Sequence, residues 1–196
     1  MDFGEFLGSI QPVDLLLFLY FAGFFVLGFA QGTIRRLIGI GSVLFSFFLA
    51  ANVAAPLGEF LGSNWTQFPR EYSYMIGFLT VFVAASLAFA IVIQGFYRPQ
   101  PLFEKARFVD ELLGGALGVL QAGVILGSFV VILDSFYRLS VPRTGNELQF
   151  LQDFWSFLDG SQIVAFFRST LIPLFFVLFG FLVPDKIEAM YPRAGS

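Results

Sequence analysis

The sequence lacks two residue types on which much protein chemistry depends, because none of its 196 residues is cysteine or histidine. Without cysteine the chain can form no disulfide, thiolate nucleophile or cysteine-ligated zinc site. Without histidine it also lacks a common zinc ligand and the side chain that most often acts as a general base near neutral pH. We therefore expect neither a metal site nor a cofactor.

Charge is scarce and apolar residues are abundant. Charged residues make up 13% of the chain, against an average of about 25% in soluble domains. Hydrophobic residues make up 57%, against an average of about 45–50%. A soluble chain this apolar could not cover its core with a polar surface, and its 29 phenylalanines suit a surface that faces lipid. The formal net charge of −3 argues against a nucleic-acid partner, which would select a basic patch.

Four uncharged runs are long enough to cross a membrane, because about 20 apolar residues span the roughly 30 Å of hydrocarbon. These runs are residues 15–34, 37–58, 72–97 and 112–133. We therefore predict an all-α membrane protein, a bundle of four transmembrane helices, with residues 1–134 as the four-span membrane domain.

A fifth apolar stretch, residues 163–183, contains Arg168 and Pro173, and only residues 169–184 are uncharged. An arginine in the centre of a span costs about 3 kcal/mol or more unless it snorkels or pairs. We favour a re-entrant or interfacial helix pair, broken near Pro173, over a full fifth span. Residues 135–196 then comprise an outer amphipathic segment and a membrane-associated C-terminal helix.

The amphipathic segment covers residues 147–159. Its apolar side chains share one helical face and its polar side chains share the other. The apolar face consists of Leu148, Leu151, Phe154, Trp155 and Leu158. The segment predicts either a helix in the membrane interface, with Trp155 at headgroup level, or a cap packed on the ends of the bundle.

Positive charges favour one orientation, since cytoplasmic loops carry an excess of lysine and arginine. The turn after the first run carries Arg35 and Arg36, whereas the N-terminal segment carries none. The other basic residues near the four runs are Arg70 in the second loop, Arg98, Lys105 and Arg107 in the third, and Arg138 and Arg143 after the fourth run. We predict cytoplasmic first and third loops and an outside N-terminus, although the last two arginines oppose this orientation.

Glycines recur at four-residue spacing. Examples are Gly28 and Gly32, Gly114 and Gly118 with Gly115 between them, and Gly123 and Gly127. In lipid, where hydrophobic attraction between helices is weak, small residues let helices associate by close backbone approach. The pattern predicts helix packing within the chain or against a second copy, although glycine is common in membrane helices and Gly28 alone is weak support.

Several stretches occur in an order that is typical of one family. Residues 28–37 read GFAQGTIRRL, residues 108–118 read FVDELLGGALG, and residues 161–164 read SQIV and precede Pro173 and Pro184. With Asp14 opening the first run, this ordered set resembles the colicin V production (CvpA) family. The resemblance implies a bacterial cytoplasmic (inner) membrane protein linked to production or export of a peptide toxin and to envelope homeostasis.

Charged residues gather at the ends of the runs. They are Asp14, Asp110, Glu111 and Asp134. Asp110 is placed to cap the fourth helix and to pair with Arg35 or Arg36. An ion or proton site there is a second interpretation. Pairing of Asp134 with Arg168 would explain how this arginine is tolerated near lipid.

Function is the least determined property. No run carries an acid or a base at its middle, so we predict a non-catalytic scaffold or accessory subunit. Its partners would be the lipid bilayer and other membrane proteins or further copies of the chain. The alternative is a small transporter or channel component acting as an oligomer, suggested by the interruption at Pro173. Thr80, Ser86 and Gln94 supply too little polarity in the third run for a pore within one copy.

Overall fold

The computed structural model describes residues 11–64, 72–96, 106–137 and 149–182, which are helical almost throughout, and no strand occurs among them. The elements are α2 (Pro12–Gln31), α3 (Thr33–Asn64), α4 (Ser73–Phe96), α5 (Arg107–Tyr137), α6 (Gln149–Asp159), α7 (Gln162–Phe166), the π-helical turn η2 (Phe167–Leu171), α8 (Ile172–Phe179) and the 3₁₀ turn η3 (Gly180–Leu182). Within these residues, five helical stretches are long and apolar enough to cross a membrane. The prediction of an all-α membrane protein is confirmed.

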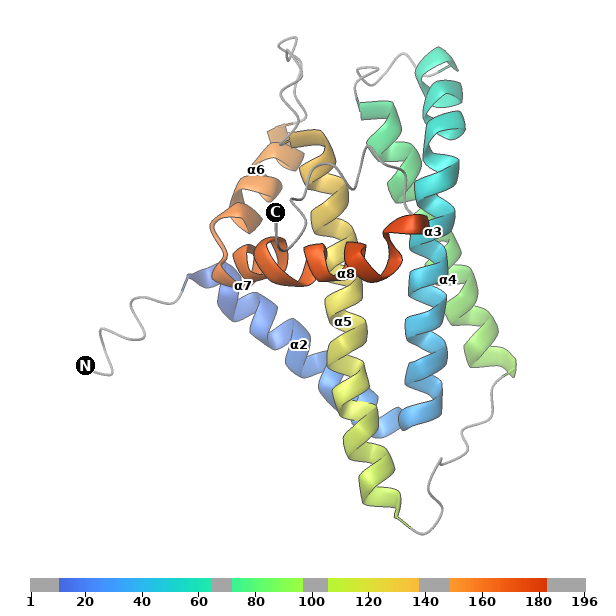
Figure 1. The fold of residues 1–196 in the computed structure, drawn as a ribbon, viewed down its shortest axis with the longest axis vertical. Helices are drawn as coiled ribbons and strands as arrows, with labels where there is room; N and C mark the ends of the chain where they lie inside the picture. The colour runs from blue at the N-terminus through green and yellow to red at the C-terminus, as the bar shows by residue number, and fades with distance from the viewer. Residues whose placement is uncertain (1–10, 65–71, 97–105, 138–148, 183–196) are drawn as a thin grey trace, which may run out of the picture.

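The four long helices form a row in the order α2, α5, α3, α4 (Figure 1). α2 and α3 diverge from their shared turn at Gly32, and α5 packs against both. α3 and α4 form an antiparallel hairpin that extends beyond the other helices at one end. The row is thin, so each long helix keeps a broad apolar face on the outside of the molecule.

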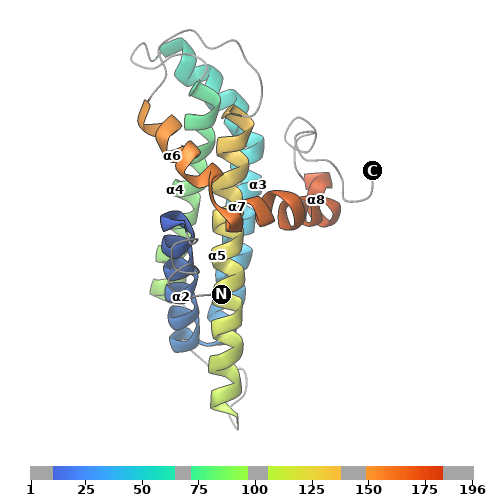
Figure 2. The same ribbon diagram turned by 90° about the vertical axis from the view of Figure 1, so that its left-hand side faces the viewer.

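The C-terminal stretch forms one continuous helical rod of α7, η2 and α8, which lies crosswise over α5 and α3 (Figures 1 and 2). The predicted break near Pro173 is wrong, because the helix continues through this residue. Pro173 lies in the first turn of α8, directly after the π-helical turn, where the missing N–H and the proline ring are tolerated.

Helix ends differ from the ends of the uncharged runs. α2 stops at Gln31 because Gly32 takes a positive φ of 75° that turns the chain. α3 continues through Pro56 to Asn64, and α5 begins already at Arg107. Charged side chains at the end of a span reach the interface without interrupting the helix, so they limit the apolar run but not the helix. Several predicted features lie outside the described residues, namely Arg70, Arg98, Lys105, Arg138, Arg143, the start of the amphipathic segment and Pro184.

The α3–α4 hairpin is held by a close contact of small residues that the glycine spacing did not reveal. A Cβ added to Gly77 would lie 3.1 Å from the Ala54 carbonyl oxygen and 3.2 Å from the Gly58 nitrogen. Ala50 and Ala54 are completely buried on the same stripe of α3. Neither Gly58 nor Gly77 was among the glycines predicted to pack, although Gly58 and Gly62 form a further GxxxG pair in α3. No glycine lies four residues from Gly77 in α4, so no such pattern marks it.

Candidate functional site

Glycine lets α2 and α5 touch backbone to backbone. A Cβ on Gly28 would lie 2.2 Å from the Gly114 carbonyl oxygen, and one on Gly118 would lie 2.2 Å from the Phe24 carbonyl oxygen. A Cβ on Gly115 would lie 2.7 Å from the Phe25 ring. No real Cβ tolerates the two backbone distances, so Gly28 and Gly118 directly set the α2–α5 separation.

The remaining pair, Gly123 and Gly127, has a different surrounding. The nearest atoms to an added Cβ belong to the Phe167 ring, at 3.6 Å for Gly123 and 3.7 Å for Gly127. These are ordinary van der Waals distances. This GxxxG pair therefore does not bring two helices together, and it lies beneath the π-helical turn.

The turn between α2 and α3 is built around Asp110. An added Cβ on Gly32 would lie 2.6 Å from Asp110 Oδ2, so a side chain there would be strained by its φ and would also clash. The Thr33 hydroxyl donates to the Asp110 carbonyl oxygen at 3.0 Å. Asp110 is buried, and with these contacts it fixes the start of α5 against the turn.

Arg36 is bound differently from the prediction. It forms no ion pair with a carboxylate in the described ranges; its Nη1 donates instead to Gln121 Oε1 at 2.7 Å. Its guanidinium lies 5.8 Å from the centre of the Phe24 ring. Gln121 was not singled out in the sequence, although an amide in the middle of an uncharged run is a recognisable signal for a polar contact between helices.

At the opposite end of α5, Asp134 is completely buried and forms the predicted pair with Arg168. Arg168 Nε donates to Oδ2 at 2.8 Å and Nη2 to Oδ1 at 2.6 Å, which is the strong two-bond geometry of an arginine–carboxylate pair. The indole Nε1 of Trp155 also donates to Oδ1, at 3.1 Å. The pair explains why an arginine is tolerated in the apolar C-terminal stretch.

The same arginine also attaches α6. Its Nη1 contacts Asp159, and its guanidinium lies 5.9 Å from the centre of the Trp155 ring. Trp155 in turn stacks on Tyr137 with ring centres 5.4 Å apart. We call Asp134, Trp155, Asp159 and Arg168 the elbow cluster, because they hold α6 and the start of the crosswise rod against α5.

Asp14 joins the first helix to the elbow between α6 and α7. Its Oδ1 accepts hydrogen bonds from the Ser161 hydroxyl at 2.6 Å and from the Ile163 nitrogen at 3.2 Å. Ser161 is the N-cap of α7 and accepts from the Val164 nitrogen at 3.1 Å. Asp14 therefore satisfies N–H groups that the helix start leaves open, and its partner was not foreseen because it lies far away in sequence.

The polar clusters lie at the two ends of an apolar zone. The part of α5 from Asp110 to Asp134 is about 36 Å long, and the part of the chain from Asp14 to Gly32 is about 27 Å long, at about 1.5 Å per residue. Both lengths are close to the roughly 30 Å of a bilayer's hydrocarbon core. The crosswise rod starts beside Asp14, at one boundary of this zone, and reaches the interior of α5, where Phe167 contacts Gly123 and Gly127.

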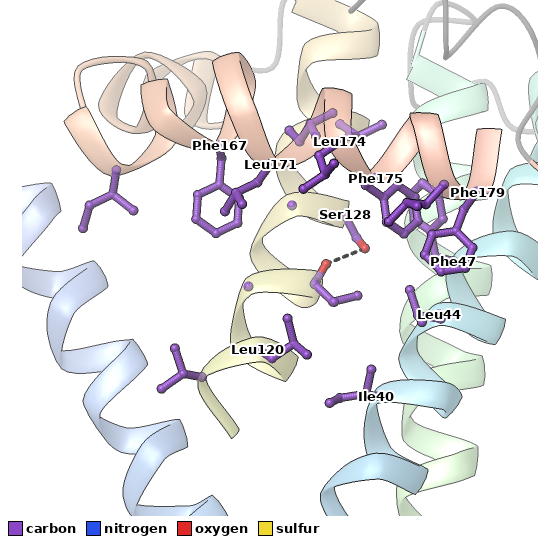
Figure 3. A pocket seen from close by; sticks show the side chains of 18 of the residues that line it. Ile40, Leu44, Phe47, Leu120, Ser128, Phe167, Leu171, Leu174, Phe175 and Phe179 are labelled. Carbon is purple, nitrogen blue, oxygen red and sulfur yellow. Dashed lines mark hydrogen bonds between the residues drawn. The ribbon is translucent and has the colours of Figure 1, made fainter. Parts of the chain in front are cut away.

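An apolar groove of 670 Å³ lies beneath the crosswise rod. α5 forms its floor, α3 forms one side, and η2 with α8 covers it (Figure 3). Ser128 is the one polar side chain in its lining, and the Ser128 hydroxyl donates to the Val124 carbonyl oxygen at 2.8 Å. Gly123 and Gly127 belong to the floor, whereas Leu171 and Leu174 belong to the cover.

A row of apolar helices with polar clusters at both ends and a crosswise helix defines a multi-pass α-helical membrane protein. The family model described as "Colicin V production protein" matches residues 13–172. The chain therefore belongs to the colicin V production protein family, and the match runs from the start of α2 to the start of α8. No curated protein and no solved structure matches the chain.

Proposed function

We propose that this protein is a non-catalytic accessory subunit of the bacterial envelope that docks another membrane protein through α6. The observation that carries the proposal is a stripe of phenylalanines on the outside of α6. Phe150 is 77% exposed, and Phe154 and Phe157 are each 42% exposed. Their spacing places them on one face of the helix, and exposed apolar patches of this kind mark interaction sites.

The stripe is separate from the face by which α6 contacts its own chain. Leu158 is buried, and Leu151 and Trp155 pack against the core. The sequence grouped Phe154 with Leu151, Trp155 and Leu158 on one apolar face, and the structure exposes Phe154 while the other three pack inward. The apolar surface of α6 is thus wider than the part that its own bundle covers. The uncovered part is free to contact a partner.

Rigidity supports the same proposal. The elbow cluster fixes α6 on α5 and the rod through the Trp155–Asp134 hydrogen bond and the Asp159–Arg168 contact, so the phenylalanine stripe is presented in one orientation. A preorganised surface loses less conformational entropy when a partner binds. The half-buried Asp14 and the buried Asp134 hold the framework together, which favours a scaffold over a reaction centre.

The test is site-specific cross-linking followed by purification in mild detergent. A photoreactive amino acid at Phe150 is expected to capture a stoichiometric partner, which mass spectrometry then identifies. The matched control carries the same amino acid at Ser156, which is exposed on the polar side of α6.

Two results would count against the accessory-subunit proposal. Equal capture from both positions would show that α6 has no specific docking face. A homogeneous oligomer of this chain alone would favour a transporter or channel component, which ion-flux measurements in liposomes would then examine.

A further inference from the structure

The groove beneath the crosswise rod is continuous with the surface that faces lipid. Leu120 of the floor is 55% exposed, and Leu174 and Leu178 of the cover are 51% and 58% exposed. Each of these side chains therefore lines the groove and also borders the outside of the bundle. Whatever occupies the groove enters from the side, out of the hydrocarbon of the membrane.

The lining selects for hydrocarbon. The hydroxyl of Ser128 already donates to the Val124 carbonyl oxygen, so it has no proton left for a ligand. Backbone groups of α5 beneath the groove are bonded within the helix. A ligand with amides, sugars or charges would lose its hydrogen bonds to water and could gain at most one here, by donating to the Ser128 oxygen. The volume lies within the range of about 300–1,000 Å³ that is usual for small-molecule sites.

The crosswise rod also limits the shape of the occupant. α8 lies crosswise over α5 and α3 (Figure 1), and its Phe175 packs against Phe47 and Phe48 in the interior of α3. A transmembrane helix placed along α5 would collide with α8 before it had crossed the bilayer. Figure 3 shows Leu171, Leu174 and Phe175 above the groove and Leu120 and Ile40 below it. A flexible chain of methylene groups, in contrast, can bend beneath the rod.

We propose that the groove binds one acyl chain of a bilayer lipid, which inserts sideways beneath the η2–α8 rod. The glycine floor fits this role, because Gly123 and Gly127 are not required for helix packing yet remove two side chains from the bottom of the groove. The bound chain would support the rod from below. This lipid site shares no part of the α6 surface, so the lipid proposal can be correct or wrong independently of the proposed docking function.

Native mass spectrometry of the detergent-purified full chain tests the proposal. The wild type is expected to retain one phospholipid through detergent exchange, and Gly127→Leu is expected to lose it because the leucine fills the floor. Gly41→Leu is the matched control, since nothing lies within 4 Å of an added Cβ there and the glycine is exposed on α3. The control is expected to retain lipid like the wild type.

A second variant fills the groove from its cover and leaves α5 unchanged. Leu174→Trp is expected to lose the bound lipid, and added phosphatidylglycerol with oleoyl chains should raise the Tm of the wild type but not that of this variant. A wild type that retains no lipid, or filled variants that retain as much as Gly41→Leu, would overturn the proposal. Capture of a protein segment by a cross-linker at Leu171 would overturn it as well.

Discussion

Individual glycines define how closely the helices of this protein approach. At Gly28 and Gly118, an added Cβ would meet a backbone carbonyl of the opposite helix, which cannot move away without separating α2 from α5. At Gly123 an added Cβ would meet only the ring of Phe167 at an ordinary distance. Identical spacing in sequence therefore corresponds to two different physical roles.

We predict that Gly118→Ala lowers the free energy of unfolding by about 1–3 kcal/mol, the usual range for overpacking a tight contact. Gly123→Ala, in the same helix, should leave the free energy of unfolding nearly unchanged. Denaturation with sodium dodecyl sulfate in mixed micelles measures both. Equal effects of the two substitutions would show that the α2–α5 contact does not depend on close backbone approach.

Asp134 and Arg168 form the second residue-scale test. Arg168→Gln should lower the free energy of unfolding by about 3–5 kcal/mol, because it removes the arginine that binds the buried Asp134 through two hydrogen bonds. Asp134→Asn should lower it less, because Arg168 keeps its contact with Asp159. The double variant should lose less than the sum of the single losses. Arg107→Gln is the control, since the Arg107–Glu111 pair is exposed and should contribute less than about 1 kcal/mol.

At the scale of elements, hydrophobicity alone located the four long helices, but it could not place the C-terminal one. A span and a helix lying in the plane of the membrane can have the same length and composition. The direction of the rod is set by the bonds of Ser161 and Ile163 to Asp14 and by the bond of Arg168 to Asp134. The Asp134–Arg168 pair was predicted from the charges, but the bonds to Asp14 join the rod to a distant helix that no local pattern around Pro173 could reveal.

We predict that the rod lies along the membrane and does not cross it. Spin labels at Phe166, Leu174 and Val177, introduced one at a time into the naturally cysteine-free chain, should all report one depth. Labels at Leu15, Leu19 and Val26 of α2 should report depths that change by about 1.5 Å per residue. Collision with oxygen and with a polar relaxation agent measures depth. A steady change along the rod would show that it spans.

At the scale of the whole molecule, the sequence predicted the fold class and the family but not the order of the helices in the row. That order depends on contacts between helices, such as Gly58 with Gly77 in α3 and α4, and these are set by shape rather than by periodicity. The orientation in the membrane is still a prediction, based on the arginines that follow Gly32.

The orientation is tested with a membrane-impermeant thiol reagent on intact cells. Asn64→Cys at the far end of α3 is expected to react from outside, whereas Arg107→Cys at the start of α5 should react only after the cells are permeabilised. The two positions lie at opposite ends of the row (Figure 1). The reverse pattern would place the N-terminus in the cytoplasm.

The bond between Asp14 and the start of α7 has a consequence for the order of biosynthesis. The ribosome completes all four long helices well before it reaches Ser161, so during that interval the carboxylate at the head of the first helix has neither its hydroxyl nor its backbone partners. During the same interval Arg168 has not yet been made, so its hydrogen bonds to Asp134 cannot have formed. The fold therefore closes only when the crosswise rod has been made. A chain released before that point would expose Asp14 without the partners that it has in the fold, a feature that quality-control proteases could recognise.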